Sequence, residues 1–346
     1  MNKQNSNSNK LEEFQGFTLI ELLIAMIVFT IATGIALAFA VSVRQQGNEV
    51  VQKTESTRGA RVAMNYLRRD VINAGLGYHR VGALIPDNYG NNMLGMPADT
   101  DVDYDLLTAL MAGDQRNVDN VSGETTDQVC FAMRDLSFNN GDSIAYDNVI
   151  LSGSSVQLRF ATKRAVPVNR YDVLLIETAT SQILAQVTYK DSNSTIVKLD
   201  PGDPLRLNLS ANGSGTNRSI LATQTGKGTI KKVNFFCYSV TPQGVLTRRQ
   251  FGNNANGNAS NQIDTRELVS GVLNFQIRYL TSSGQVLDDP SNGNDGRTNQ
   301  QQMNQVVQVE ITITVSSLDD TGTNAEGEPY TLQETISTRN LRYDLG

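Results

Sequence analysis

The chain has 346 residues and a net charge of −6, with 29 Lys and Arg against 35 Asp and Glu. This acidic balance disfavours non-specific nucleic-acid binding, which rests on clustered Lys and Arg. The length leaves room for one large domain or two modest ones, at roughly 100–200 residues each. The absence of Trp, the single His and the abundant Asn, Gly, Ser and Thr favour an exported, loop-rich β protein over a metabolic enzyme.

Residues 1–16 form a polar N-terminal segment, and a long apolar run from Phe17 to Val43 follows it. As an α-helix rising ~1.5 Å per residue, this run reaches about 40 Å, which exceeds the ~30 Å hydrocarbon core of a bilayer. The sequence therefore predicts a transmembrane helix over residues 17–43. Lys3 and Lys10 favour a cytoplasmic N-terminus under the positive-inside rule.

Glu21 is the one charged residue inside this apolar run. A carboxylate in such a segment costs on the order of 2.5–3.5 kcal/mol on insertion scales and needs a partner or a proton. No cationic residue lies within two helical turns of Glu21, so we expect its partner to lie outside this helix. Cleavage between Gly16 and Phe17 would create a positively charged α-amino group four residues before Glu21.

The segment Gly16-Phe17-Thr18-Leu19-Ile20-Glu21, with the apolar run behind it, resembles the processing site of type IV pilins and type II secretion pseudopilins. This resemblance implies that residues 1–16 are a leader peptide, that a prepilin peptidase cuts after Gly16, and that Phe17 becomes the N-methylated N-terminus. It also implies that Glu21 neutralises the amine of a neighbouring subunit during assembly. The alternative is an ordinary signal anchor in which Glu21 is incidental.

Residues 44–76 are predicted to continue the helix with an amphipathic pattern, because apolar residues recur at spacings of three and four. The apolar positions are Val51, Ala60, Ala63, Met64, Leu67 and Val71. The arginines between them are expected to form a solvated helix face; they are Arg58, Arg61, Arg68 and Arg69.

Two glycines interrupt this helix and two more follow it. Gly47 and Gly59 are interpreted as soft spots, each costing about 1 kcal/mol relative to Ala. The helix is expected to end between Asn73 and Gly77, where Gly75 and Gly77 follow closely. The sequence thus predicts one helix of about 55–60 residues, half in the membrane and half packed on a domain.

A second, narrower resemblance runs along the chain. The helix end, residues 61–75, is similar to that of PilW-type minor pilins, which are akin to GspJ-type pseudopilins. The stretches 171–176, 267–280 and 338–342 fit the same group. This resemblance implies an α+β, type IV pilin-like fold, in which a long N-terminal helix packs on an antiparallel β-sheet domain with loop-rich insertions.

Residues 77–346 are predicted to form that β-rich domain. Residues 77–127 show little periodicity and are expected to be irregular and exposed, with a short helix at Leu106–Met111. Strand composition marks residues 128–134, 156–161, 173–178, 183–189, 195–199, 229–240, 245–251, 273–281, 306–316 and 330–337. The clearest alternation, from Val307 to Val315, predicts a half-buried strand. Polar loops are expected at 208–227, 252–262, 282–304 and 319–328.

The two cysteines, Cys130 and Cys237, lie far apart in the sequence. Their spacing is unlike that of a metal motif, and zinc would need more ligands than one His and two Cys readily supply. In an oxidising compartment they can form a disulfide. Both also lie in strand-like runs, where a buried free thiol is equally ordinary, so both states stay open.

No enzyme constellation stands out in the sequence. His79 is the only histidine, so a Ser-His-Asp or Cys-His arrangement would have to use it, and its place at a helix exit favours a surface or packed residue. No phosphate-binding loop or dinucleotide fingerprint is present. Two acidic runs lack the EF-hand spacing; they contain Asp99, Asp101, Asp103 and Asp105, and Asp288, Asp289 and Asp295. We expect no catalysis, metal or cofactor, with calcium binding by these loops as an alternative.

Together these features favour a minor pilin of a type IV pilus, which acts by assembly rather than by catalysis. The resemblance implies a single-pass inner-membrane protein with a periplasmic head that later enters a pilus filament or reaches the cell surface. Its partners would be the prepilin peptidase, other major and minor pilins and the inner-membrane pilus assembly machinery. A type II secretion pseudopilin is the first alternative, and a signal-anchored periplasmic enzyme or binding protein is the second.

Overall fold

The computed structural model describes residues 18–78, 82–87, 105–118, 123, 125–152, 155–161, 166–190, 195–208, 226–252, 262–288, 305–316 and 329–342. It divides into two compact units, Met1–Gln52 and Lys53–Gly346, each of which is described by itself. The polar loops predicted between the strands fall largely outside the described residues.

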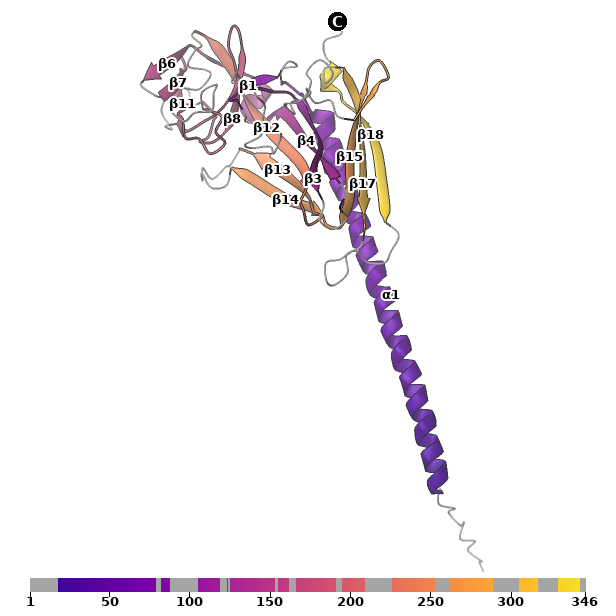
Figure 1. Ribbon diagram of the computed structural model, residues 1–346. Coiled ribbons are helices and arrows are strands. Elements are labelled where there is room, and N and C mark those ends of the chain that lie inside the picture. The colour runs from indigo at the N-terminus through magenta and orange to yellow at the C-terminus, as the bar shows by residue number, and fades with distance from the viewer. Residues whose placement is uncertain are drawn as a thin grey trace, which may run out of the picture. The chain divides into compact units, whose positions relative to one another are not determined.

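One helix, α1 (Leu19–Asn73), contributes to both units (Figure 1). Its 55 residues confirm the predicted length and end. Gly75 follows with a φ of +78°, a left-handed conformation that favours Gly and terminates helices. The Gly75 N–H donates to the Ala132 carbonyl at 2.9 Å, and Asn340 Nδ2 donates to the Ile72 carbonyl at 3.1 Å. The second bond satisfies one of the carbonyl groups that a helix C-terminus leaves without helical partners.

The described residues of the second unit form three β-sheets. The largest holds β1 (Ala83–Ile85), β2 (Asp105–Leu107), β3 (Leu110–Val118), β4 (Thr125–Arg134), β5 (Ile144–Tyr146), β8 (Val173–Glu177), β9 (Gln182–Gln186), β12 (Gly228–Val240), β13 (Leu246–Phe251) and β14 (Ile263–Val269). The second holds β6 (Asn148–Ser152), β7 (Ser155–Arg159), β10 (Tyr189–Lys190) and β11 (Ile196–Lys198). The third holds β15 (Val272–Thr281), β16 (Val286–Leu287), β17 (Val306–Val315) and β18 (Tyr330–Ser337). Short 3-10 helices occupy Phe138–Gly141 and Asn340–Arg342.

The long strand β12 organises the largest sheet, whose order is β14-β13-β12-β8-β9-β1-β2. The first part of β12 pairs with β8 and β5, and its last part pairs with β13 and β4. β3 extends this sheet through β4. The described strands pair antiparallel except for β1 with β9. The fold is therefore α+β with a long N-terminal helix and an antiparallel-rich β domain, as predicted, although it has three sheets rather than one.

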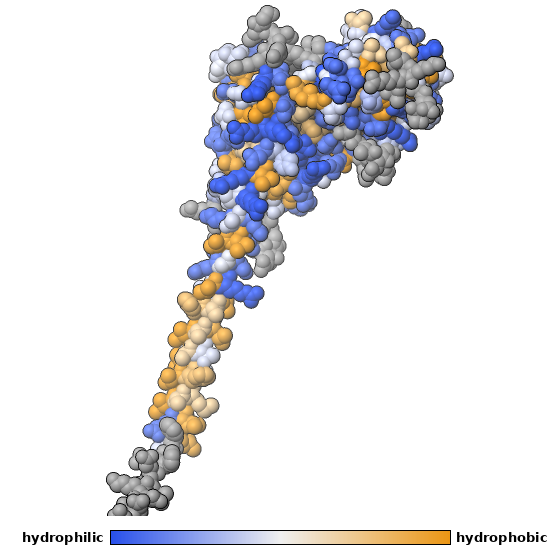
Figure 2. Space-filling view, turned by 180° about the vertical axis from the view of Figure 1, so that it is seen from behind, coloured by the Kyte–Doolittle hydropathy of each residue, from blue (hydrophilic) through white to orange (hydrophobic). Residues whose placement is uncertain are grey.

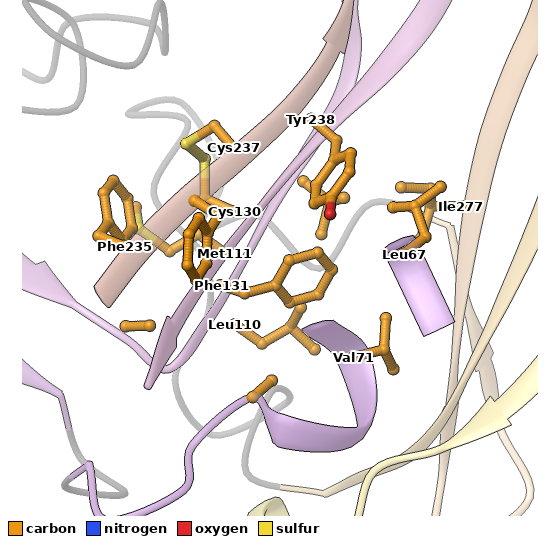
Figure 3. Close-up of a cluster of buried hydrophobic side chains, with 14 of the residues drawn as sticks. Leu67, Val71, Leu110, Met111, Cys130, Phe131, Phe235, Cys237, Tyr238 and Ile277 are labelled. Atoms are coloured by element: carbon orange, nitrogen blue, oxygen red, sulfur yellow. A yellow bond between two sulfur atoms is a disulfide. The ribbon is translucent and has the colours of Figure 1, made fainter. Parts of the chain in front are cut away.

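The larger core forms where α1 packs on the sheets. The predicted apolar stripe of the second unit is buried; its members are Ala60, Ala63, Met64, Leu67 and Val71. Figure 3 shows Leu67 beside Ile277 of β15, and Val71 beside Leu110 and Phe131 of the largest sheet. The prediction is wrong for Val51, which is 56% exposed. The four predicted surface arginines of α1 are exposed, as expected.

A smaller second core lies between the β6–β7–β10–β11 sheet and the opposite face of β8, β9 and β12. β8 contributes to both cores: Val173 and Leu175 belong to the first, and Leu174 and Ile176 to the second. Because successive side chains of a strand point to opposite faces, a strand buried on both faces is apolar throughout. Within the described residues, α1 contributes only to the first core.

The alternation predicted for residues 307–315 is confirmed in β17, whose Val309, Ile311, Ile313 and Val315 are buried. Val307 is half-buried, close to the start of the strand. The residues between them line the other face of the sheet. β17 is one of the two inner strands of its four-stranded sheet and pairs with β15 and β18.

Residues 106–111 are not the predicted helix, and the excursion from Gly77 to Asp127 is not simply irregular. Residues 105–107 form β2 and residues 110–118 form β3. Leu and Met favour helices, but this propensity is a weak prior that tertiary pairing overrides. Here Leu106 pairs with Leu84, and Leu110 pairs with Phe131. The short strands β1, β5, β6, β14 and β16 were also not predicted.

Cys130 and Cys237 form a disulfide, which settles in this structure the alternatives left open above. The two residues face each other directly across the antiparallel pair of β4 and β12. Both are buried in the larger core, and Figure 3 shows their bond. The disulfide therefore joins two neighbouring strands of the sheet that packs on α1.

Candidate functional site

The strongest candidate site is the start of α1. Gly16 and Phe17, the predicted cleavage and methylation residues, lie outside the described residues. Thr18 is the first described residue, and the helix begins at Leu19. Glu21 therefore lies in the first turn of the helix, where its negative charge complements the positive end of the helix dipole.

Thr18 and Glu21 cap this helix reciprocally. The Thr18 N–H and the Thr18 hydroxyl both donate to Glu21 Oε2, at 3.0 Å and 2.9 Å. The Glu21 N–H in turn donates to Thr18 Oγ1 at 3.3 Å. This is a capping box, in which a Ser or Thr before the helix and a Glu three residues later satisfy each other's groups. Glu21 thus has hydrogen-bond partners within its own helix.

This pairing adds to the expectation that a charged partner of Glu21 lies outside its helix, because Thr18 carries no charge. The spacing Thr-x-x-Glu is itself a recognisable capping signal in the sequence. Hydrogen bonds from Thr18 do not neutralise the carboxylate. The proposed pairing of Glu21 with an amine is therefore compatible with the capping box and is not tested by it.

The helix behind this cap exposes an apolar surface in the first unit. Leu19, Phe29 and Phe39 are 81%, 74% and 70% exposed, and Figure 2 shows the apolar side chains around this part of the helix. By length and composition, α1 is long and apolar enough to cross a membrane. Such a surface is costly in water and is consistent with membrane anchoring.

Two threonines inside the apolar run satisfy their hydroxyl groups within the helix. The Thr30 hydroxyl donates to the Met26 carbonyl at 2.7 Å, and the Thr33 hydroxyl donates to the Phe29 carbonyl at 2.8 Å. In hydrocarbon an unsatisfied polar group is expensive, so such internal bonds make threonine acceptable there. The run is thereby compatible with a membrane or with an apolar interface between helices.

At its other end, α1 is joined to the largest sheet by a buried polar cluster. Asp70 Oδ2 accepts from the Tyr238 hydroxyl at 2.6 Å and from Arg248 Nε at 2.9 Å. All three residues are almost fully buried. The guanidinium of Arg248 also lies 3.7 Å from the centre of the Phe236 ring. The exposed Arg69 pairs with Asp70 Oδ1 at 3.2 Å.

This cluster was not predicted, because Tyr238 and Arg248 lie far from Asp70 in the sequence. Burial raises the pKa of the Tyr238 hydroxyl, and the Asp70 charge beside it raises it further. Tyr238 therefore stays protonated and donates to the carboxylate. A buried charge needs such partners to be tolerated, and this one ties the helix to β12 and β13.

Most of the remaining predicted site residues lie outside the part of the chain that the structure describes. Asp99, Asp101, Asp103, Asp289 and Asp295 lie outside the described residues, as does His79. Asp105 lies in β2, and Asp288 follows β16. Within the part of the chain that the structure describes, no three His, Cys, Asp or Glu side chains are grouped to hold a metal ion.

A cavity of about 500 Å³ opens beside the turn between β8 and β9. Its described lining consists of Gly82, Leu84, Leu106, Thr178, Ala179, Thr180, Ser181 and Gln182. These side chains include hydroxyl, amide and aliphatic groups but no ionisable one. The described lining thus supplies no general acid or base of the usual kinds.

Residues 14–37 match the family described as the prokaryotic N-terminal methylation motif. The match begins before Gly16, covers the capping box and ends inside the apolar run. No curated protein matches the chain. The motif supports a type IV pilin-like protein, pilin or pseudopilin, and implies processing by a prepilin peptidase and use of pilin assembly machinery. It also points to a structural role.

Proposed function

We propose that this chain is a minor pilin of a type IV pilus, which assembles through its N-terminal helix to prime the filament or occupy its tip. The observation that carries the proposal is the exposed apolar helix headed by Thr18 and Glu21 within the methylation motif. The prepilin peptidase would cut after Gly16 and methylate Phe17. The mature chain would then span residues 17–346, with residues 17–43 as the membrane and assembly segment.

In this mechanism the apolar part of α1 moves from lipid into contact with the helices of other subunits. The surface stays buried from water in both environments, so the transfer exposes little apolar area. The Thr18 bonds to Glu21 lower the cost of holding a carboxylate at the head of the helix. The amine of a neighbouring subunit would then provide the opposite charge that the capping box lacks.

The size of the head favours a priming or tip position. A wide head crowds the packing of helices in a repeating shaft, and this head has two cores and three sheets. The proposed orientation places the N-terminus in the cytoplasm and the head in the periplasm, before the protein enters the filament with other major and minor pilins.

A type II secretion pseudopilin is the alternative, because the methylation motif supports pilins and pseudopilins alike. The two functions differ in the filament that the chain enters. Pilus genes or secretion genes beside the coding gene would separate them. Loss of pili, or loss of secretion, in a deletion strain would decide between the two assignments.

The primary experiment measures the mass of the N-terminal peptide from membranes, with and without the prepilin peptidase. We expect the peptide to start at an N-methylated Phe17 in the parent strain and at Met1 in the peptidase mutant. An intact Met1 start in both strains would remove the pilin proposal and leave a signal-anchored protein.

A further inference from the structure

The free edge of β18 differs from the other exposed strand edges of the head. Of the strands that pair on one side alone, β3 has 9 residues, β18 has 8, β14 has 7 and β6 has 5. The sequence of β3 contains two charged residues, Asp114 and Arg116. Within the described part of the chain, β18 pairs with β17 alone. No described strand lies beside the opposite edge of β18.

The register identifies the backbone groups that point out from this edge. The Thr338 N–H donates to the Val307 carbonyl at 3.0 Å, so this pair bonds inward across the ladder. In an antiparallel pair, such residues alternate with residues whose N–H and C=O point away. The outward-pointing residues of β18 are therefore Thr331, Gln333, Thr335 and Ser337. All four side chains are exposed.

This edge lacks the charges that usually protect a strand from pairing. Its four outward residues are uncharged, and the single charge of β18, Glu334, pairs with Arg68 of α1 at 3.2 Å. By contrast, the edge strand β14 exposes Asp264, Arg266 and Glu267. Proline, which also blocks pairing, is absent from β18. The outward edge of β18 is thus long and uncharged.

We propose that the free edge of β18 docks an extended strand from a different subunit of the assembly, which adds to the β15–β18 sheet. Main-chain hydrogen bonds would supply affinity, and the side chains on either side of the edge would supply selectivity. This inference rests on the proposed function in one respect, namely that the chain is assembled beside other subunits.

The direction of the strands favours a different subunit over a second copy. Two copies that join by the same edge are related by a two-fold axis, which sets their β18 strands antiparallel. The strands of this sheet run lengthwise along the Lys53–Asn73 end of α1 (Figure 1), so that end of the helix would be reversed too. Helices anchored in one membrane from the same side share one direction.

The test uses the full chain in its native membrane, with the photo-crosslinking residue p-benzoylphenylalanine at Thr335. Two variants at the neighbouring outward position form a matched pair. Gln333→Pro removes the outward N–H, and proline is tolerated there because edge positions facing solvent need no donor. Gln333→Ala removes the side chain but keeps the N–H. Gln333→Lys, which places a charge on the edge, is the second blocking variant.

We expect a crosslink to a chain of different mass, mapped by peptide sequencing to an extended segment of that chain. Its yield should fall at least about tenfold in Gln333→Pro and Gln333→Lys and stay within about twofold in Gln333→Ala, since the backbone bonds carry the docking. Formation of the Cys130–Cys237 disulfide and equal protease resistance of the head verify folding of each variant. If Gln333→Pro fails this folding check, the crosslink yield of Gln333→Lys tests the docking instead.

Equal crosslinking in the blocking and alanine variants would overturn the proposal, as would a crosslink found only between copies of this chain. The mass of the N-terminal peptide from the same samples separates this inference from the proposed function. A processed Phe17 without the edge crosslink contradicts the docking alone. An unprocessed Met1 start contradicts the pilin function, whatever the crosslink shows.

Discussion

Thr18 and Glu21 illustrate at the residue scale how one motif can serve two purposes. The spacing that places Glu21 five residues into the proposed mature chain also places it three residues after Thr18, where it caps the helix. A cap at this point stabilises the first helical turn by about 0.5–2 kcal/mol. Both Thr18 donors bind Glu21 Oε2 in this arrangement, and neither supplies the positive charge that an amine would bring.

Two variants separate these roles. Glu21→Gln keeps an acceptor for Thr18 but removes the charge, so we expect normal processing and membrane insertion but loss of the protein from sheared filaments. Thr18→Val removes the hydroxyl and keeps the charge, so incorporation should persist with a helix start weakened by about 0.5–2 kcal/mol. Immunodetection of each variant in membrane and filament fractions measures its membrane insertion and its incorporation into filaments. Wild-type levels of Glu21→Gln in filaments would contradict the charge pairing.

Asp70 shows the opposite case, a charged residue whose role depends on residues far away in the sequence. Asp70→Ala would leave Arg248 buried without a carboxylate, and removal of one partner of a buried pair costs about 3–5 kcal/mol. Tyr238→Phe should cost about 1.5–3 kcal/mol, the range for a hydrogen bond to a charged group. Urea unfolding of the full chain in detergent, followed by circular dichroism, measures the change.

Arg69→Ala is the control for this cluster, because the Arg69 side chain is exposed and its ion pair with Asp70 should contribute less than about 1 kcal/mol. A loss as large as that of Asp70→Ala would contradict the assignment of the stabilising contact to Arg248. A small effect of Asp70→Ala would show that α1 is held by apolar packing alone.

At the scale of elements, the two interior glycines of α1 differ although the sequence suggests the same role for both. A Cβ added at Gly59 would lie 2.9 Å from Val269 Cγ2, so the helix approaches the end of β14 closely there. A Cβ at Gly47 would meet no atom within 4 Å. The soft-spot interpretation therefore misses a packing requirement at Gly59.

Replacing each of these glycines by alanine should change the stability of the protein in opposite directions. Gly47→Ala should stabilise the helix by up to about 1 kcal/mol, the propensity difference between Gly and Ala. Gly59→Ala should destabilise the head by about 1–3 kcal/mol, because the β-branched Val269 is stiff and must be displaced. Thermal unfolding of both variants tests this. If Gly47→Ala and Gly59→Ala stabilised the protein equally, α1 and the end of β14 would move apart without a cost in free energy.

At the scale of the whole molecule, the disulfide links two strands through a loop of 107 residues. Closing a loop of about this length restricts the unfolded chain, and native disulfides typically contribute about 2–4 kcal/mol. The double variant Cys130→Ala and Cys237→Ala should lower the free energy of unfolding by that amount. The β4–β12 ladder should persist, because its backbone bonds do not require the sulfurs.

Wild-type protein that is denatured, reduced and then refolded with the reductant present is the control. It lacks the disulfide but keeps both cysteine side chains, so it separates loss of the bond from loss of side-chain volume. Refolded, reduced wild type should resemble the double variant in urea unfolding. If both match the oxidised protein, the disulfide contributes little to stability, and the chain-entropy argument fails for this head.

The methylation motif and the apolar helix behind it were readable from the sequence, because their signals are local. Gly16, Phe17, Glu21 and the apolar run lie within a few helical turns of one another, and residues 14–37 match the methylation motif. The stripe from Ala60 to Val71 was readable for the same reason, since a helix repeats its buried face every three or four residues. Even the missed Thr18–Glu21 cap is a local pattern.

What only the tertiary structure decided are pairings between distant segments. Leu106 and Leu110 became strand residues because their partners lie in β1 and β4, and helix propensity was too weak to oppose that pairing. Asp70 was buried because Tyr238 and Arg248 meet it from β12 and β13. A local pattern specifies periodicity and caps, but the free energy of burying a polar residue or a short strand depends on which distant groups surround it.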